Sequence, residues 1–451
     1  MNRPLCCFLF YLAFLPVLTL AEGNPALWRG SMETDQRLLL QENQEWAWNE
    51  NRLDLTLEKR QRPLQILANI RFRHFGPSLT EQSADLFDRD KINPWNLDMR
   101  ELFVSLHGFL LDDLDVKIGR QQIAWGTADR FNPTNNLNPY DLEDVLDFGR
   151  VMGSDAINVE WHTSFQSSLQ VVYIMRFQPA AMPLGVFSGL FDLSVPILLP
   201  QGEMLLQVES DELIMPRNNF SDGSGLGIRW KSFAFNTDYS FSYIYRRDPL
   251  PLPEHVTIAL DPQTEELSAH ASMMFPRHHI LGADFAGTVG RTGIWGELAV
   301  FVPESKAVMN MFFPDRMVAE SRTLLDKPYL KFVLGADYTF AGGSYLNVQY
   351  LRGFLHERGR DELNDYLFIQ TERYYLQNRL RIQPLAGGFS ISDRNNPGDH
   401  HSWIYSPEVS WLGMDNLEIS LGGFFFGGKG GGILAGMKDF DMVRLQVKAN
   451  F

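Results

Sequence analysis

In the last ten residues of the chain, Met442 to Phe451, apolar and polar side chains alternate strictly from Val443 onward. The apolar positions are Val443, Leu445, Val447, Ala449 and Phe451, and the polar positions between them are Arg444, Gln446, Lys448 and Asn450. Because successive side chains of a β-strand point to opposite faces, this period of two predicts a strand with one apolar and one polar face. Such a strand, ending on an aromatic residue, is typical of the closing strand of a membrane barrel, although a terminal strand of a soluble sandwich has the same pattern.

The start of the chain separates these two interpretations. Met1 to Ala21 carries one basic residue, Arg3, followed by an apolar run and a small residue, which is the pattern of a cleaved secretory signal peptide. The run is too short for a spanning helix. The sequence therefore predicts a signal peptide followed by one mature domain, residues 22–451. Both cysteines, Cys6 and Cys7, fall in the signal, so disulfides, thiolate catalysis and cysteine-bound metals are excluded from the mature domain.

The mature domain is acidic and rich in aromatic residues. The chain has 40 Lys and Arg against 55 Asp and Glu, and removal of the signal with its single arginine leaves 39 against 55, a net charge of −16. This charge disfavours nucleic acid as a partner. A secreted, aromatic-rich chain of alternating segments about ten residues long predicts a closed membrane barrel, because only a closed sheet satisfies every backbone polar group in a bilayer.

Alternating segments recur along the whole chain, and we predict about sixteen to eighteen strands. The clearest are residues 64–73, 102–110, 114–125, 156–162, 168–177, 226–233, 238–246, 279–287, 294–302, 329–340, 344–354, 402–411, 417–426 and 442–451. Tight connections alternate with long ones; the long ones are 76–96, 126–155, 178–225, 247–278, 303–328 and 427–440. Barrels of the outer membrane have short periplasmic turns and long extracellular loops, so the predicted fold is an all-β, transmembrane, antiparallel up-and-down β-barrel.

The most specific local sequence is Lys117 to Gly126, which reads Lys-Ile-Gly-Arg-Gln-Gln-Ile-Ala-Trp-Gly. Two Asn-Pro steps, at 132–133 and 138–139, follow in the next loop. This text, together with Pro276 to Ala286, resembles an uncharacterised family of Gram-negative outer-membrane barrels whose members have a Gly-Arg-Gln strand closing in Trp-Gly before a Pro-containing loop. The resemblance implies a passive or partner-assisted transport role and identifies no solute. We interpret Trp125 as an anchor at the membrane interface.

Charged and polar residues of this strand and loop are predicted to line the pore: Arg120, Gln122, Asp129, Arg130, Asp141 and Asp144. Arg120 would face Asp129, Asp141 or Asp144 across the lumen and create a transverse field that orients polar solutes. The alternative, of equal weight, is a buried ion pair that holds the inward-folded loop against the barrel wall. The same two interpretations apply to Gln122.

The stretch from Ala180 to Pro200 is unusually apolar for a long external loop, with Asp192 as its one charged residue. Its prolines argue against a spanning helix. Because so much apolar surface should not stay in water, three explanations compete. The stretch is a plug inside the lumen, a lid packed on neighbouring loops, or an apolar entrance for hydrophobic molecules.

Sequence motifs that resemble enzyme sites lack a residue or an arrangement that catalysis requires. Gly423 to Lys429 begins like a phosphate-binding loop, but Gly430 stands where Ser or Thr should hold magnesium. The pairs Asp112-Asp113 and His400-His401 resemble catalytic pairs of outer-membrane proteases, yet they are predicted to lie at opposite ends of the barrel. We therefore predict no catalytic residues, no metal site and no cofactor.

The function predicted from these observations is an outer-membrane channel, porin-like or an export conduit, for an unidentified solute. The alternatives are a conduit for lipids or other hydrophobic molecules that works with a periplasmic or inner-membrane partner, and an outer-membrane barrel enzyme, which is disfavoured. The expected location is the outer membrane of a Gram-negative bacterium. Expected partners are outer-membrane lipids and the barrel-assembly machinery, which would recognise the closing strand with Val443, Leu445, Val447 and Phe451.

Overall fold

The structure, a computed structural model, describes residues 25–41, 45–76, 78–80, 82–191, 194–199, 202–260, 267–313 and 318–451. The predicted signal peptide lies outside these residues. Helices are few and short in the described part: η1 (Ser83–Phe87), α2 (Arg89–Ile92), η2 (Gly185–Phe191) and α3 (Ile433–Gly436). None of them is long and apolar enough to cross a membrane.

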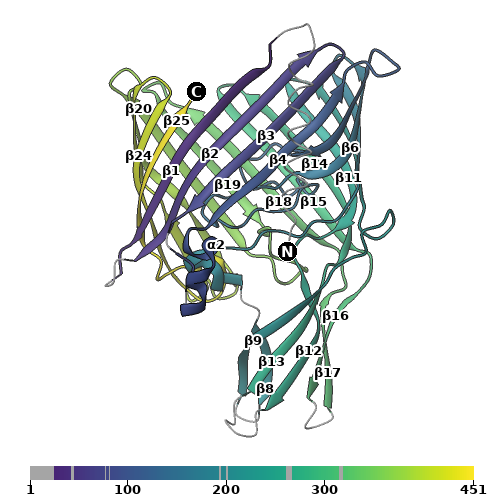
Figure 1. Ribbon diagram of the computed structural model, residues 1–451, viewed down its shortest axis with the longest axis vertical. Helices are drawn as coiled ribbons and strands as arrows, with labels where there is room; N and C mark the ends of the chain where they lie inside the picture. The colour runs from purple at the N-terminus through teal and green to yellow at the C-terminus, as the bar shows by residue number, and fades with distance from the viewer. Residues whose placement is uncertain are drawn as a thin grey trace.

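Most of the described chain forms one closed antiparallel sheet, the barrel wall (Figure 1). Its strand segments are β1 (Leu27–Leu39), β2 (Trp46–Gln61), β3 (Leu64–Phe75), β4 (Trp95–Leu106), β5 (Leu114–Gln121), β6 (Ser154–Ser164), β7 (Ser167–Ile174), β10 (Gly225–Ala234), β11 (Thr237–Arg247), β14 (Arg277–Val289), β15 (Thr292–Pro303), β18 (Tyr329–Thr339), β19 (Ser344–Arg352), β20 (Asp365–Tyr375), β21 (Leu380–Ile391), β22 (His401–Tyr405), β23 (Glu408–Met414), β24 (Leu417–Lys429) and β25 (Met442–Asn450). Pairing of β25 with β1 closes the sheet.

Two of these nineteen segments belong to a single wall strand. Both β22 and β23 pair with β21 on one side and β24 on the other, and they are separated only by Ser406 and Pro407. Proline cannot donate a backbone hydrogen bond, which explains a local break in the ladder. The wall therefore has eighteen strands in the described residues, and the predicted barrel class and strand number are confirmed.

The predicted alternation of faces is confirmed at the closing strand. In β25 the side chains of Val443 and Leu445 are exposed on the outer surface, whereas Arg444 turns inward and pairs with Asp35 of β1. Exposed Leu, Ile, Val and Phe side chains recur on the outside of the other wall strands. An apolar exterior and a charged interior are the pattern of a barrel that lies in lipid.

Short and long connections lie at opposite ends of the barrel (Figure 1). The short turns include residues 62–63, 165–166, 235–236, 290–291 and 415–416. Phe235 and Asn236 both have positive φ, as expected for a tight two-residue hairpin turn. By the general rule for outer-membrane barrels, the short-turn end faces the periplasm and the long-loop end faces outward.

Three of the long loops contain strands that the sequence analysis treated as irregular. The strands β8 (Ser194–Leu199), β9 (Gly202–Ile214), β12 (Leu252–Leu260), β13 (Leu267–Met274), β16 (Ala307–Phe313) and β17 (Val318–Leu325) form a separate six-stranded sheet. It projects from the long-loop end of the barrel (Figure 1). Two of its pairings, β12 with β16 and β13 with β9, are parallel and join different loops. The sequence analysis predicted long connections at these places and assigned no strands to them.

Candidate functional site

The connection between β5 and β6, residues 122–153, folds into the barrel lumen, and we call it the inner loop. It begins earlier than predicted, because β5 ends at Gln121 and the predicted strand continued to Trp125. The chain begins to leave the wall near Gly119. The φ of this glycine is +126°, and a Cβ there would lie 2.3 Å from the Leu102 carbonyl oxygen. After the strand ends, Ile123 and Trp125 are buried within the barrel.

Trp125 is therefore not the interface anchor that the sequence suggested. Its ring is 1% exposed, its Nε1 donates a hydrogen bond to Gln170 Oε1 at 2.8 Å, and the guanidinium of Arg229 lies 5.8 Å from the ring centre. A buried indole needs a partner for its N–H, and a wall residue supplies it here. The tryptophan fastens the start of the inner loop to the wall.

Glu297 of β15 holds the middle of the inner loop. Its carboxylate accepts hydrogen bonds from the backbone N–H groups of Thr127 and Ala128 at 2.5 and 2.6 Å, and from the N–H and hydroxyl of Thr134 at 3.2 and 2.7 Å. The side chain is almost completely buried. One carboxylate thus satisfies three backbone donors that the turn of the loop would otherwise leave unpaired.

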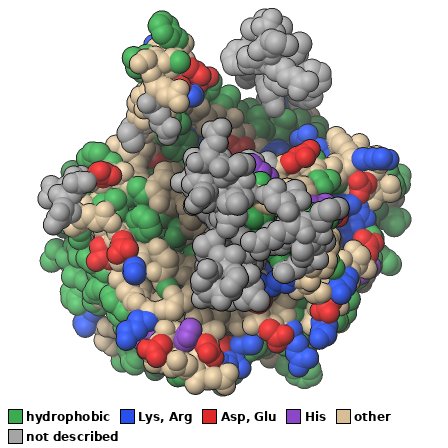
Figure 2. Space-filling model, turned by 90° about the horizontal axis from the view of Figure 1, so that it is seen from below, with side chains coloured by type: hydrophobic (Ala, Val, Ile, Leu, Met, Phe, Trp, Pro, Cys, Tyr) green, Lys and Arg blue, Asp and Glu red, His purple; other side chains and the backbone are tan. Residues whose placement is uncertain are grey.

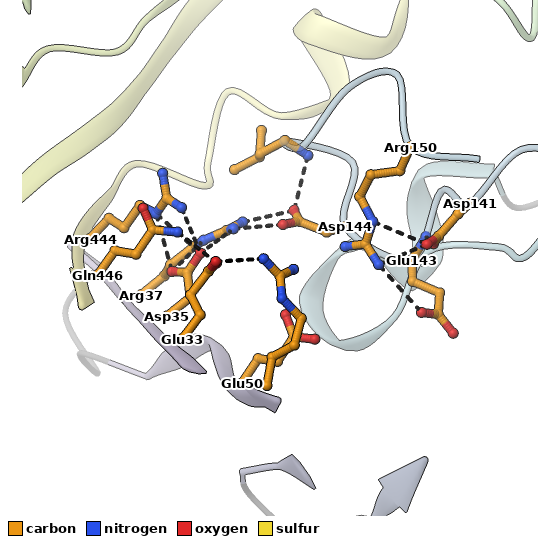
Figure 3. A network of polar contacts seen from close by, with 12 residues as sticks. Glu33, Asp35, Arg37, Glu50, Asp141, Glu143, Asp144, Arg150, Arg444 and Gln446 are labelled. Carbon is orange, nitrogen blue, oxygen red and sulfur yellow. Dashed lines mark hydrogen bonds and ion pairs between the residues drawn. The ribbon is translucent and has the colours of Figure 1, made fainter. Parts of the chain in front are cut away.

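The far end of the inner loop is held by ion pairs to the opposite wall (Figure 3). Arg37 of β1 makes a bidentate contact with Asp144, at 2.8 and 2.6 Å, and a second contact with Asp35 at 2.8 Å. Arg73 of β3 pairs with Glu143 of the loop. Burial alone would raise the pKa of Asp144, but the Arg37 guanidinium and its hydrogen bonds outweigh burial and hold the pKa well below its usual range.

Two further wall residues contact the loop between these ends. Arg246 of β11 donates hydrogen bonds to the backbone oxygens of Asn136 and Asn138, and Asn347 of β19 donates to Asp129 at 3.0 Å. The inner loop is consequently attached to several sides of the wall. It crosses the lumen as a fixed partition.

The predicted pairing of Arg120 was wrong. Its Nε donates to the Met99 carbonyl oxygen at 2.7 Å, and its Nη1 lies 3.7 Å from Asp155, so it faces none of the three acids expected across the lumen. Gln122 donates to the Val151 carbonyl oxygen at 2.7 Å. Arg120 thus contacts the neighbouring strands β4 and β6, and the Gln122 side chain bonds within the inner loop. Neither side chain forms the ion pair between loop and wall that was the alternative.

The partition leaves two cavities. The larger, of about 630 Å³, extends toward the short-turn end and is lined by acidic and basic side chains of the wall together with Asp129, Arg130 and Asp144. The smaller, of about 320 Å³, lies toward the long-loop end, between the inner loop and the ends of β15, β18 and β19. Asp141 is in neither lining; it pairs with Arg150 at 2.8 Å.

Aromatic rings separate the two cavities. Phe131 and Phe148 of the inner loop line both of them. The Phe131 ring stacks on Phe368 of β20 with centroids 4.4 Å apart and contacts Phe354 at 5.4 Å, while Phe148 contacts Phe354 edge-on at 5.5 Å. These four rings, the aromatic barrier, fill the space between the partition and the wall.

The apolar stretch from Ala180 to Pro200 is divided between two places. Its first half forms η2, where Phe187 is fully buried and contacts Phe440 at 5.7 Å, and it packs with the hydrophobic core around α3. Its second half forms β8 of the six-stranded sheet. The side chains of residues 191–200 lie outside what can be described, and the choice between plug, lid and entrance stays open for them.

The residues that matter most to this site were not singled out from sequence. Glu297 and Arg246 lie in predicted alternating segments, where an inward position was their only signal, and Arg37 lies in no segment predicted as a strand. The two suspected catalytic pairs lie at opposite ends of the barrel, Asp112-Asp113 in the β4–β5 turn and His400-His401 at the start of β22.

Charged side chains also lie around the rim at the long-loop end of the barrel (Figure 2).

Comparison with known proteins gives a family. The family described as "Protein of unknown function (DUF1302)" matches residues 43–309, more than half of the chain. The chain belongs to this family. The match includes both segments on which the resemblance to an uncharacterised barrel family rested. No curated protein matches the sequence significantly.

Solved structures share the fold. OccAB4 of Acinetobacter baumannii has a TM-score of 0.51 at 8% identity, covering 95% of this chain and 99% of that one. OccAB1 of the same organism has a TM-score of 0.50 at 9% identity, with 96% and 98% covered. At such low identity the likeness shows a porin-like barrel fold and nothing about the solute.

Proposed function

We propose that the protein is a porin-like channel of the Gram-negative outer membrane, in which the inner loop forms the constriction. The observation that carries this proposal is the attachment of the loop inside the lumen through Glu297 and Arg37, which leaves a charged cavity on one side and a smaller cavity on the other. A loop fixed across a lumen narrows the path without closing the barrel. Selectivity then depends on the charges and rings that line the constriction.

The internal charges support a path for polar solutes. Arg52, Arg381 and Arg444 face the larger cavity and each contacts a wall carboxylate, so the lining presents both signs of charge. Charged groups are costly to bury unless water or a partner compensates them, and a lumen that holds water and ions provides for both. The apolar outer surface would place the same wall in lipid.

Planar-bilayer recording of the refolded mature protein tests the proposal. We expect discrete current steps in salt, and larger steps from a variant in which residues 127–150 are replaced by a short Gly-Ser linker. A barrel that is folded, as judged by heat-modifiable migration, and that passes no current in either form would contradict the channel.

A conduit for hydrophobic molecules is the second candidate, and the aromatic barrier is the observation that favours it. The aromatic barrier between the cavities would bind an apolar solute better than a hydrated ion. Entry of a lipophilic fluorescent probe into proteoliposomes discriminates the two. Probe uptake without ionic current favours the hydrophobic conduit, and current without uptake favours the polar channel.

A further inference from the structure

The smaller cavity has a different chemistry from the rest of the lumen. Three cationic residues line it, Arg130, Arg150 and Lys331, and no Asp or Glu occurs among the lining residues that the structure describes. The larger cavity, by contrast, is lined by acids and bases together. Positive charge without lining carboxylates is an unusual arrangement inside an acidic barrel, and it sets the sign of a ligand.

Two of the cations have no carboxylate bound to them. Arg130 is exposed and makes no hydrogen bond or ion pair with any residue in the described part of the chain. Lys331 is 5% exposed, and its Nζ donates to the backbone oxygens of Phe354 and Leu355 at 2.7 and 3.3 Å. Asp248, which acts on Lys331 electrostatically, is itself bound by Arg358 at 2.6 Å. Arg130 therefore keeps a positive charge that no described carboxylate neutralises, and Lys331 adds a buried amino group held by backbone oxygens.

Arg150 adds an unused donor. Its Nη2 pairs with Asp141 at 2.8 Å, which neutralises most of its charge, but its Nη1 is buried and has no hydrogen-bond partner among the described residues. A buried guanidinium nitrogen without a partner costs free energy. Because this nitrogen has almost no accessible surface, it makes no contact with the cavity in the structure as it stands.

The remaining lining mixes apolar and polar side chains. Phe301 and Leu351 come from the wall, Leu355 comes from the connection between β19 and β20, and the inner loop supplies Phe131, Phe148 and asparagine side chains. The volume of about 320 Å³ is at the small end of the range for organic ligands. An inorganic anion has no apolar surface to bury, so these apolar side chains would not strengthen its binding.

We propose that the smaller cavity is a binding site for a small organic anion with one apolar ring or a body of similar size. Its acidic group lies between Arg130 and Lys331, and its apolar body lies against Phe301 and the aromatic barrier. The inference rests on the proposed channel, because it names the class of solute that would bind on the long-loop side of the constriction. Binding itself can be measured without any current.

The test is fluorine NMR of 4-fluorobenzoate, 4-fluorobenzylamine and 4-fluorobenzamide with the refolded barrel in detergent. We expect broadening of the benzoate signal alone, reversed by unlabelled benzoate and not by the same concentration of acetate. Equal binding of all three probes, or of none, would overturn the site. Displacement by acetate would show that charge alone is recognised and would overturn the apolar half of the proposal.

Two variants and a matched control locate the site. Arg130→Gln and Lys331→Met should each weaken benzoate binding about three- to tenfold, the usual effect of removing one partly screened charge contact. Lys231→Gln removes a lumen cation that pairs with Asp238 and lines neither cavity, and it should leave the affinity unchanged. Equal losses in all three variants would mean that only the net charge matters and would refute the assignment.

Current recordings on the same preparations keep the two proposals separate. Ionic current without benzoate binding leaves the channel standing and removes the anion site. Benzoate binding that depends on Arg130, without ionic current, keeps the site and removes the channel.

Discussion

Asp144→Asn is the substitution that tests most directly whether ion pairs hold the inner loop in the lumen. Removing one partner of a buried pair costs about 3–5 kcal/mol when the other charge is left alone. Arg37 keeps Asp35 as a partner at 2.8 Å, so we expect a smaller cost, about 2–3 kcal/mol. Because the wall ladder is untouched, the cost falls on loop docking and weakens it about 30- to 150-fold.

The assay is single-channel recording together with the midpoint of heat-modifiable migration. Asp144→Asn should give larger and noisier current steps as the loop near residue 144 loosens, while Arg73 still binds Glu143 and Glu297 still holds the middle. The migration midpoint should change little. Replacing both partners, Arg37→Met with Asp144→Leu, removes the stranded charge and should return current noise toward that of the unmodified protein.

Unchanged current in Asp144→Asn would refute the argument that this ion pair fixes the constriction. A double variant noisier than the single one would refute the part of the argument that depends on the unpaired Arg37 charge.

Low pH provides an independent check of the same ion pair. A carboxylate whose pKa is depressed in the folded state contributes stability above its unfolded pKa and loses it as pH falls through the folded pKa, so the loop should stay docked from neutral pH down to about pH 4.

Three further outcomes are expected. Phe131→Ala should raise the conductance, because it opens the aromatic barrier between the cavities, and current recordings with Phe220→Ala on the exposed outer loop as a control would check this. Arg120→Ala should lower the thermal stability by about 1–2 kcal/mol and leave ion selectivity unchanged, because its contacts are structural; a changed reversal potential with normal stability would restore the pore-lining role. Deleting Val447 to Phe451 should abolish heat-modifiable folding, because it leaves part of β1 without its partner strand.

The barrel wall could be predicted because its signal is local. Residues 64–73 and 442–451 alternate with period two, and each alternation requires only that one face meets lipid and the other the lumen. The tight turns between strands are equally local, since a hairpin joins neighbours in sequence. Strand number and pairing order then follow from chain order in an up-and-down barrel.

The six-stranded sheet could not be predicted in the same way. Val256 and Ile258 alternate within β12, so a strand signal was present in the predicted loop. Its antiparallel partner β13 follows in the same loop, but the contact that builds one sheet from three loops is parallel, with His255 of β12 opposite Asn310 of β16. Parallel pairing between separate loops has no turn to mark it, so the sequence gives no signal that these hairpins assemble into one sheet.

The contacts that hold the inner loop were harder to predict from the sequence than the six-stranded sheet. Asp144 was recognised as a lumen group, but its partner Arg37 lies 107 residues away among many inward-facing arginines. Periodicity gives the face of each charge and leaves the choice of partner to the three-dimensional path of the loop. That path depends on Glu297, whose carboxylate binds backbone N–H groups, and backbone groups carry no sequence signal. The wall is thus determined by side-chain pattern, whereas the constriction is determined by buried contacts that form only once the wall exists, and loop variants can alter conductance without altering the barrel.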